Sequence, residues 1–165
     1  MIEKTCCFTG HRSIPAAEHE NLCKKLENAV ETLIKKGYRY FGSGGALGFD
    51  TVAAQTVLKL KEKYPSVKLI LVLPCKNQPQ RWSEQDKRDY EEIKRKADKC
   101  TYVSESYQIG FMHKRNRFLV DNSSACICYL SQNSGGTAYT VKYAKSKGLK
   151  IINLHGSKYT DEPTT

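Results

Sequence analysis

Residues 41 to 50 of the chain are Phe41-Gly42-Ser43-Gly44-Gly45-Ala46-Leu47-Gly48-Phe49-Asp50. A short apolar strand runs here into a glycine-dense turn, and the turn opens an amphipathic helix. Such a turn lets backbone N–H groups converge at a helix N-terminus, where an anion such as phosphate is favoured. The glycine spacing is G-x-G-x-x-x-G, which differs from the dinucleotide-binding pattern. The stretch predicts a strand–turn–helix unit with an anion site, although a tight turn alone also needs some glycine.

Apolar strands alternate with amphipathic helices along the rest of the chain. Strands are predicted over 4–8, 38–41, 67–73, 100–103, 125–130 and 150–154. Helices are predicted over 15–36, 51–63, 83–97 and 109–120, and between a second glycine turn and Gly148. This alternation favours the α/β class: a single Rossmann-like domain with an open parallel sheet of about six strands and helices on both faces. We expect this domain over 1–155 and a frayed C-terminal tail over 156–165.

The loops that follow the strands are the expected place for a ligand. In an open parallel sheet, ligands bind outside the carboxyl ends of the strands. Five strand-to-helix loops should therefore lie along one edge: Thr9–Arg12, Ser43–Gly48, Lys76–Trp82, Ser104–Gln108 and Ser131–Thr137.

The charge balance favours a polyanionic partner. The chain has 27 Lys and Arg against 17 Asp and Glu, a formal net charge of +10, which suits nucleotides or nucleic acid. Half or more of this charge also fits ordinary solvated helix ends. The chain contains no apolar run of the roughly 18 to 20 residues that a membrane span needs, so we expect a cytoplasmic protein without a membrane partner.

The seven cysteines are predicted to be buried, reduced thiols. No C-x-x-C pair occurs in the chain. Five of the cysteines fall in strand-like apolar runs: Cys6, Cys7, Cys100, Cys126 and Cys128. Cysteine in such runs packs as a small hydrophobe. Cys126 and Cys128 share one strand face, but no partner pair has the spacing of a zinc site. We therefore predict no structural zinc, no other metal and no cofactor.

Several segments of the chain carry a resemblance to a known superfamily. Ser43–Thr51 with Ala53-Ala54 resembles the S-G-x-A-x-G-x-D segment of the DNA-processing protein A family. Met112–Asn116, the strand after Asn122 and Ser134-Gly135-Gly136-Thr137 are similar to the M-x-x-R-K helix, strand and P-G-G-x-G-T turn of the Lonely Guy phosphoribohydrolases. With the Thr9–Arg12 opening and the Arg81-Trp82 loop, the chain is most similar to a bacterial branch of the SLOG (SMF/DprA-LOG) superfamily.

The resemblance implies a Rossmann-like fold whose sheet edge binds a nucleotide or a nucleotide-derived molecule, and it implies a homo-oligomer. Arg115 stands where the phosphoribohydrolases have an arginine important to their site. A guanidinium there would offer a fork of donors to phosphate or to the sugar. The alternative is an arginine exposed on a helix.

The chain departs from the phosphoribohydrolase pattern at residues that would be needed to break an N-glycosidic bond. The expected glutamate three residues after Thr137 is absent from Tyr139-Thr140-Val141-Lys142. Breaking an N-glycosidic bond develops positive charge on the sugar, which a carboxylate stabilises and Lys142 would oppose. Ser134 and Ala138 also stand where proline and glycine are usual. Asp50 or Glu105 would have to serve instead, and Asp50 is more simply a helix-start residue. The sequence therefore leans against an enzyme and leaves Arg115 as the candidate catalytic residue.

Two further loop features are candidate ligand contacts. His11-Arg12 would contact phosphate or a base edge, or would be surface charges. Trp82 beside Arg81 would stack on a base, or would anchor the start of the next helix. The predicted ligand-binding residues are Gly10, His11, Arg12, Ser43, Gly44, Gly45, Gly48, Asp50, Arg81, Trp82, Arg115, Ser134, Gly135, Gly136 and Thr137.

Three functions agree with these features to different degrees. The favoured one is binding or sensing of a nucleotide-derived small molecule, which suits both glycine turns and the missing glutamate. The second is a phosphoribohydrolase-like N-glycosidase on nucleoside monophosphates, supported by Arg115. The third is single-stranded DNA binding, supported by the net charge and the Ser43–Asp50 match.

Overall fold

Six parallel strands form one sheet in the order β4-β3-β2-β1-β5-β6. The computed structural model of the chain describes residues 1–105 and 109–156. The strands are β1 (Thr5–Gly10), β2 (Tyr40–Ser43), β3 (Lys68–Leu73), β4 (Lys99–Tyr102), β5 (Ala125–Tyr129) and β6 (Lys150–Asn153). Every neighbouring pair is parallel, so all six carboxyl ends lie along one edge.

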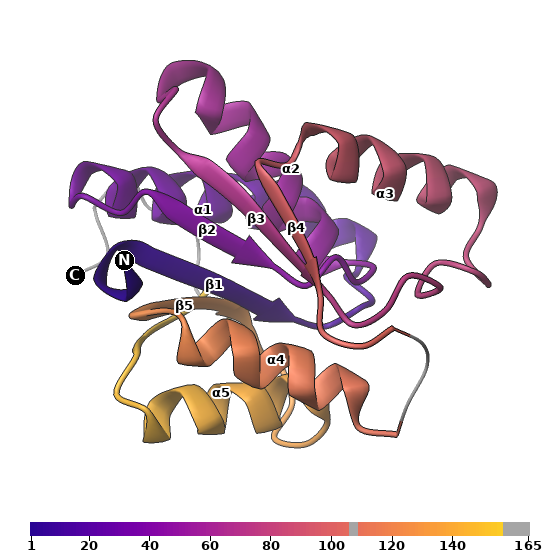
Figure 1. Cartoon of the computed structure of the whole chain (residues 1–165). Helices are drawn as coiled ribbons and strands as arrows, with labels where there is room; N and C mark the ends of the chain where they lie inside the picture. Colours follow the sequence, from indigo (N-terminus) through magenta and orange to yellow (C-terminus); the bar gives the residue numbers. More distant parts are fainter. Residues whose placement is uncertain (106–108, 157–165) are drawn as a thin grey trace.

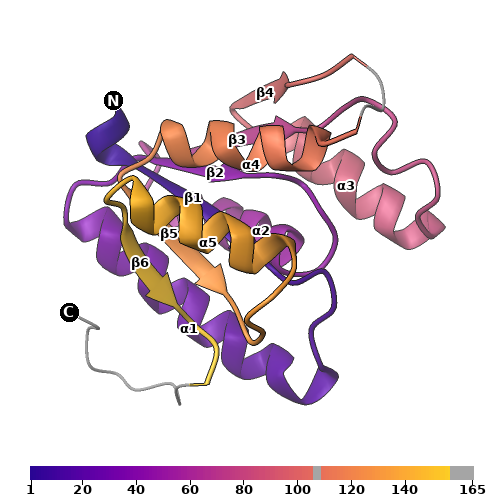
Figure 2. The same cartoon turned by 90° about the horizontal axis from the view of Figure 1, so that it is seen from below.

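Five α-helices cover the two faces of this sheet in the described residues. Figures 1 and 2 show α1 (Ala16–Lys35), α2 (Phe49–Lys63) and α3 (Glu84–Lys96) on one face, and α4 (Phe111–Asp121) and α5 (Gly136–Ser146) on the other. Helix contacts follow the same division, because α1 and α3 pack beside α2 while α4 packs beside α5. The predicted Rossmann-like α/β architecture is confirmed.

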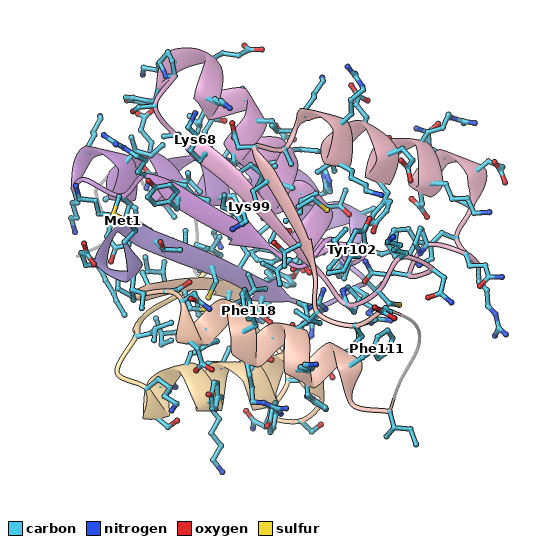
Figure 3. All side chains as sticks on the ribbon, in the orientation of Figure 1. Met1, Lys68, Lys99, Tyr102, Phe111 and Phe118 are labelled. Atoms are coloured by element: carbon cyan, nitrogen blue, oxygen red, sulfur yellow. The ribbon has the colours of Figure 1, made fainter. Side chains whose placement is uncertain are left out.

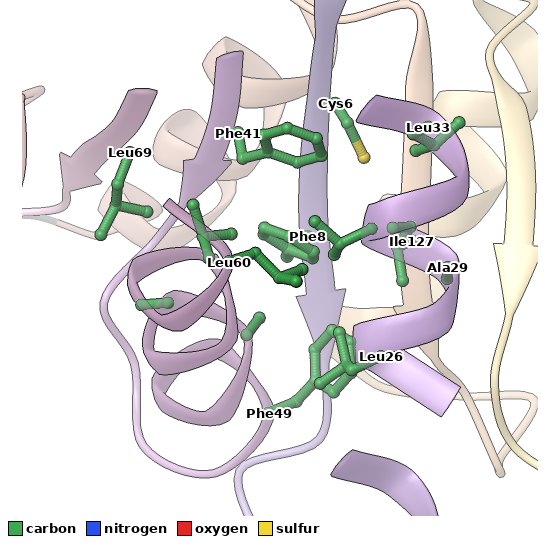
Figure 4. Packing of buried hydrophobic residues seen from close by; sticks show 14 of the residues in the cluster. Cys6, Phe8, Leu26, Ala29, Leu33, Phe41, Phe49, Leu60, Leu69 and Ile127 are labelled. Atoms are coloured by element: carbon green, nitrogen blue, oxygen red, sulfur yellow. The ribbon is translucent and has the colours of Figure 1, made fainter. Parts of the chain in front are cut away.

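The larger core lies between the sheet and the α1–α2 layer (Figure 4). Phe8 on β1 stacks on Phe41 of β2 with ring centroids 6.2 Å apart, and Phe49 meets Phe8 edge-on at 6.3 Å. All three side chains are almost fully buried. Because Phe49 is the first residue of α2, its burial holds that helix immediately after the glycine turn.

The opposite face carries a smaller core in which cysteines take part. Cys7, Cys126 and Cys128 pack there with Val141 and Ala144 of α5. All seven cysteines are free thiols, and burial raises the pKa of Cys128 to about 12. The buried thiols act as small apolar side chains, whereas Cys23 and Cys100 are only partly buried, contrary to the prediction. Within residues 1–105 and 109–156, no cluster of three or more His, Cys, Asp or Glu side chains is placed to hold a metal ion.

Several element boundaries differ from the predicted ones. A 3-10 turn, η1 (Ile2–Lys4), precedes β1 and was not expected. Helix α2 begins at Phe49 rather than residue 51, so Asp50 lies inside the first turn. Helix α4 begins at Phe111 because Gly110 takes a left-handed conformation at its N-cap. The predicted cap of α3 is confirmed, since Ser83 Oγ accepts the Asp86 N–H at 3.1 Å.

Parts of two predicted segments lie outside the described residues. They are 157–165 of the expected tail and 106–108 of the loop after β4. In the part of the chain that the structure describes, no helix combines the length and apolar character needed to cross a membrane.

Candidate functional site

The strand order creates a crevice beside β1. From β1 the chain runs outward through β2, β3 and β4 in one direction, whereas β5 and β6 lie on the other side. The helix that follows β1 covers one face and the helix that follows β5 covers the other, so this is the switch point where open sheets bind ligands. A pocket of about 320 Å³ lies there. Its lining is Thr9, Gly10, His11, Arg12, Ala46, Asp50, Met112, His113, Arg115, Asn116, Gln132, Ser134, Gly135, Gly136 and Thr137.

The first glycine turn is closed by its own hydrogen bonds. Ser43 Oγ donates to the Asp50 carbonyl at 3.1 Å and accepts the Gly45 N–H at 3.3 Å. Asp50 Oδ2 accepts the Ala46 N–H at 3.2 Å. Two backbone donors that an anion would need are therefore used inside the turn. Of this stretch, Ala46 and Asp50 line the pocket, whereas the predicted ligand contacts Ser43, Gly44, Gly45 and Gly48 do not.

Gly48 joins this turn to the loop after β1. Its φ is +74°, which side chains rarely adopt, and a Cβ there would lie 2.3 Å from the Arg12 carbonyl oxygen. The Phe49 N–H donates to the His11 carbonyl at 3.1 Å. The close approach of the two loops brings His11 and Arg12 to the pocket.

Arg115 is turned inward and clamps the first glycine turn. Its side chain is 3% exposed and donates through Nη1 to the Gly44 carbonyl and through Nε to Asn116 Oδ1. A Cβ on Gly44 would lie 2.3 Å from Nη1, so only glycine leaves room for this guanidinium. The sequence analysis expected either a guanidinium available to a ligand or an arginine exposed on its helix. Arg115 lines the pocket, but its guanidinium is buried and donates to the Gly44 carbonyl, so neither expectation is fully met.

Asp50 and Arg115 influence each other electrostatically. Burial raises the pKa of the Asp50 carboxyl, while the positive charges of Arg115 and Arg12 and the Ala46 N–H act in the opposite direction. Burial lowers the pKa of Arg115, and the Asp50 charge opposes this. The guanidinium of Arg115 is buried, so Arg12, which is exposed and lines the pocket, is the arginine there that is open to an anion.

His11 ties together the loops after β1 and β5. Its Nε2 accepts the Ser131 N–H at 2.9 Å, which requires a neutral imidazole, and its ring meets Tyr129 edge-on at 6.0 Å. Burial and the neighbouring His155 lower the pKa of His11, which favours the same neutral form. The role of His11 in the described structure is thus to position the second glycine turn.

The second glycine turn opens directly into the pocket. Gly135 is the N-cap of α5 with φ +97°, and no side chain caps this helix. The N-terminus of α5 therefore presents unpaired N–H groups and a partial positive charge. Ser134, Gly135 and Gly136 are exposed, whereas Thr137 is buried. This turn, rather than the first one, offers backbone donors to an anion.

Sequence reasoning found Arg115 on the part of α4 that faces the pocket but missed its neighbours Met112, His113 and Asn116 as lining residues. Met112, Arg115 and Asn116 follow an i, i+3, i+4 spacing, the signal that could have found them. His113 also lines the pocket, and its ring meets Tyr139 of α5 at 4.5 Å. In the described chain, its buried Nδ1 has no hydrogen-bond partner.

The Arg81-Trp82 pair is not brought to this pocket. Trp82 is partly buried and packs edge-on against Tyr90 of α3, with ring centroids 5.3 Å apart. Arg81 is exposed on the loop that precedes Ser83. The packing alternative therefore describes the position of Trp82.

A second, more apolar groove lies on the α4 face of the sheet, away from the pocket. It has a volume of about 400 Å³ and runs from η1 across β2 and β3 to α4. Figure 3 labels Met1, Lys99 and Phe118, which contribute to its lining. Met1 and Phe118 are among the most exposed large apolar side chains of the described residues.

Two solved structures share this fold. DNA processing protein A (DprA) from Streptococcus pneumoniae aligns with a TM-score of 0.67 and 18% identity, over 94% of this chain and 51% of that protein. A Helicobacter pylori structure, described as giving insight into the single-stranded DNA binding mode of the same protein, aligns with a TM-score of 0.62 and 18% identity over 89% of this chain. The chain spans 63% of the Helicobacter protein.

Sequence relatives cover the same region. The SPbeta prophage-derived protein YoqJ of Bacillus subtilis is 34% identical in an alignment 146 residues long, which covers 79% of this chain and 85% of YoqJ. A UPF0398 protein of Bacillus cereus is 30% identical in an alignment 162 residues long, which covers 92% of this chain and 88% of that protein. The model of the family YpsA, described as the YspA SLOG family, matches residues 6–154. Since that match covers most of the chain, the chain belongs to the YspA SLOG family.

Proposed function

We propose that this chain binds single-stranded DNA, with one phosphate of the strand in the pocket at the switch point. The observation that carries the proposal is the uncapped N-terminus of α5 at Gly135–Thr137, which faces the same pocket as the exposed Arg12. Backbone donors and a helix dipole favour a phosphate, and Arg12 adds a full positive charge. The net charge of +10 supports a polyanionic partner.

The likeness to DprA supports DNA as the source of that phosphate. One of the two DprA structures is described by its single-stranded DNA binding mode, and its fold covers 89% of this chain. Elsewhere in the lining, Arg115 donates to the Gly44 carbonyl and the neutral His11 ring accepts the Ser131 N–H. The pocket thus suits a diester phosphate with a single negative charge.

Fluorescence anisotropy of a labelled oligothymidylate tests the proposal. We expect binding that weakens with salt and an affinity that falls in Arg12→Ala. Arg95→Ala is the matched control, because Arg95 is an exposed arginine on α3, away from the pocket. Absence of binding at low salt, or equal losses in the two variants, would refute DNA binding at this pocket.

A free nucleotide or nucleotide-derived small molecule is the second candidate. The observation that favours it is the volume of about 320 Å³, enclosed by the loops after β1, β2 and β5 and by α4, since small-molecule sites begin at roughly 300 Å³. A thermal-shift panel of nucleotides distinguishes the two sources, because a ligand at 100 times its Kd adds about 2.7 kcal/mol of stability. A nucleotide that stabilises the protein while oligothymidylate does not bind would favour this candidate.

The N-glycosidase alternative gains little from the site. Lys142 is exposed on α5 and does not line the pocket, so its charge would not face a sugar bound there. Among the lining residues, Asp50 carries the carboxylate, and its Oδ2 already accepts the Ala46 N–H. Release of free base from adenosine monophosphate, lost in Arg115→Ala, remains the assay that would revive this reaction.

A further inference from the structure

An aromatic ring stands exposed beside the pocket at the switch point. Tyr139 lies on the first turn of α5, where its N–H donates to the carbonyl of the N-cap residue Gly135 at 3.0 Å. It is 42% exposed, and its ring meets the ring of His113 with centroids 4.5 Å apart. His113 belongs to the lining of the pocket. The Tyr139 ring therefore continues the pocket onto the outer surface of α5.

Two side chains of α4 hold this ring in place. Arg117 donates through Nη1 to the Tyr139 hydroxyl at 3.2 Å. One turn earlier on the same helix, His113 meets the Tyr139 ring edge-on at an interplanar angle of 65°. The hydroxyl end and the body of the ring are thus both contacted, by residues at i and i+4 of one helix. A ring that is already held loses little side-chain freedom when a ligand packs on it.

The backbone that carries Tyr139 is tied to the pocket. Asn116, a lining residue, donates through Nδ2 to Thr140 Oγ1 at 3.0 Å, and Thr140 Oγ1 donates to the Gly136 carbonyl at 2.9 Å. Helices α4 and α5 lie side by side in Figures 1 and 2. These hydrogen bonds join the two helices at the first turn of α5, so the ring is fixed relative to the N–H groups of that turn.

We propose that Tyr139 is a stacking platform for a base of the bound strand. The proposal rests on the proposed function, because it concerns the nucleotide whose phosphate lies at the N-terminus of α5. A base is joined to its phosphate through one sugar, so a ring that adjoins the pocket is placed to meet it. The side chains that hold Tyr139 are a guanidinium and an imidazole, and neither would repel a polyanion.

Stacking also defines the specificity of the platform. Every base has a π face, so an aromatic ring recognises the presence of a base and not its identity. The Tyr139 hydroxyl already accepts a hydrogen bond from Arg117. We therefore expect a strand with bases to bind more tightly than one without them.

Tyr139→Ala tests the platform with two probes, an oligothymidylate and an abasic strand of the same length, measured by fluorescence anisotropy. We expect the wild-type protein to prefer oligothymidylate. Tyr139→Ala should weaken oligothymidylate binding roughly 5- to 150-fold, the effect of removing one base–aromatic stack. Its affinity for the abasic strand should not change, because the phosphate contacts remain.

Phe118→Ala is the matched control. Phe118 is 43% exposed, close to the exposure of Tyr139, and lines the apolar groove away from the pocket. Figure 3 labels Phe118 on α4. This variant removes an aromatic ring of similar exposure, so it should leave the affinity for both strands unchanged.

A tryptophan at the same position gives a spectroscopic test that does not depend on the alanine variant. Trp82 is the only tryptophan of the chain and packs on Tyr90. In a Trp82→Phe background, Tyr139→Trp makes the introduced indole the sole reporter. Stacking of thymine on this indole should quench its fluorescence, and the abasic strand should not. The affinity for oligothymidylate should be kept or raised, because tryptophan also stacks.

The outcomes distinguish the platform from the proposed function. Equal, salt-dependent affinity of the wild-type protein for both strands overturns the platform and leaves phosphate binding in place. Equal losses for both strands in Tyr139→Ala also overturn it, because the ring then only shapes the pocket. Binding of oligothymidylate without quenching of the introduced indole does the same. If neither strand binds at low salt, the proposed function fails and the platform fails with it.

Discussion

Replacing Gly44 by alanine tests the clamp between Arg115 and the first glycine turn. The new Cβ would lie 2.3 Å from Arg115 Nη1 and 2.5 Å from Cζ, so the guanidinium must move. That group is the end of a long side chain, and its displacement relieves the steric overlap. The displacement also breaks the hydrogen bond to the Gly44 carbonyl inside the protein, where Arg115 is 3% exposed.

The expected loss of stability follows from these contacts. A hydrogen bond to a charged group contributes about 1.5 to 3 kcal/mol. Alanine stabilises by about 0.4 to 1 kcal/mol through the unfolded chain, because Gly44 has no positive φ. We therefore expect a net loss of about 0.5 to 2.6 kcal/mol, which lowers the Tm of a domain of this size by roughly 1 to 10 °C.

Urea unfolding of Gly44→Ala measures this loss, with Gly136→Ala as control. Gly136 is a glycine of the second turn with open space around a built Cβ, so alanine there should be neutral or stabilising by up to about 1 kcal/mol. In an Arg115→Met background, Gly44→Ala should lose most of its effect, because the clamp is already gone. Equal stability of the two alanine variants, or an undiminished effect in that background, would refute the clamp.

Other predictions concern single contacts. Arg12→Ala should flatten the log–log salt dependence of oligothymidylate binding by about 0.7, the contribution of one phosphate contact on a single strand, and an unchanged slope would contradict that contact. Ser83→Ala should cost about 1 kcal/mol in urea unfolding through the lost cap of α3. His11 has a pKa below its unfolded value of about 6.5, so its stabilising effect is complete above that pH and is lost as pH falls through the folded pKa. His11→Gln should remove this loss, and an unaltered pH profile of the unfolding midpoint would contradict it. Sedimentation checks the homo-oligomer that the resemblance implies, and the mass of a single chain would exclude it.

The fold was predictable because its signals are local and periodic. Buried strands such as Ala125–Tyr129 are apolar runs, and helices such as α1 show an apolar stripe that ends at basic residues and Gly37. Boundaries set by tertiary contacts were less predictable. The start of α2 moves to Phe49 because that ring enters the core against Phe8, and no rule of helix propensity contains this contact.

The site was predictable in its location and less so in its contacts. Parallel strands bring their carboxyl ends together, so a pocket lined by Gly10–Arg12 and Ser134–Thr137 follows from topology alone. The inward orientation of the Arg115 side chain could not be predicted from topology, because it depends on a hydrogen bond to the Gly44 carbonyl of a distant loop. Trp82 likewise packs on Tyr90 through a contact between a loop and a helix that sequence spacing does not encode.

The inward turn of Arg115 decides how a phosphate would be held. With this guanidinium paired to Gly44 and opposed by Asp50, a phosphate in the pocket meets the N–H groups of α5 and the single exposed charge of Arg12. Backbone N–H groups release no counterions, whereas each cation–phosphate contact on a single strand contributes a log–log salt slope of about −0.7. Binding confined to the pocket should therefore show a shallow slope, despite the net charge of +10. A steep slope would instead indicate that lysines outside the pocket contact the strand.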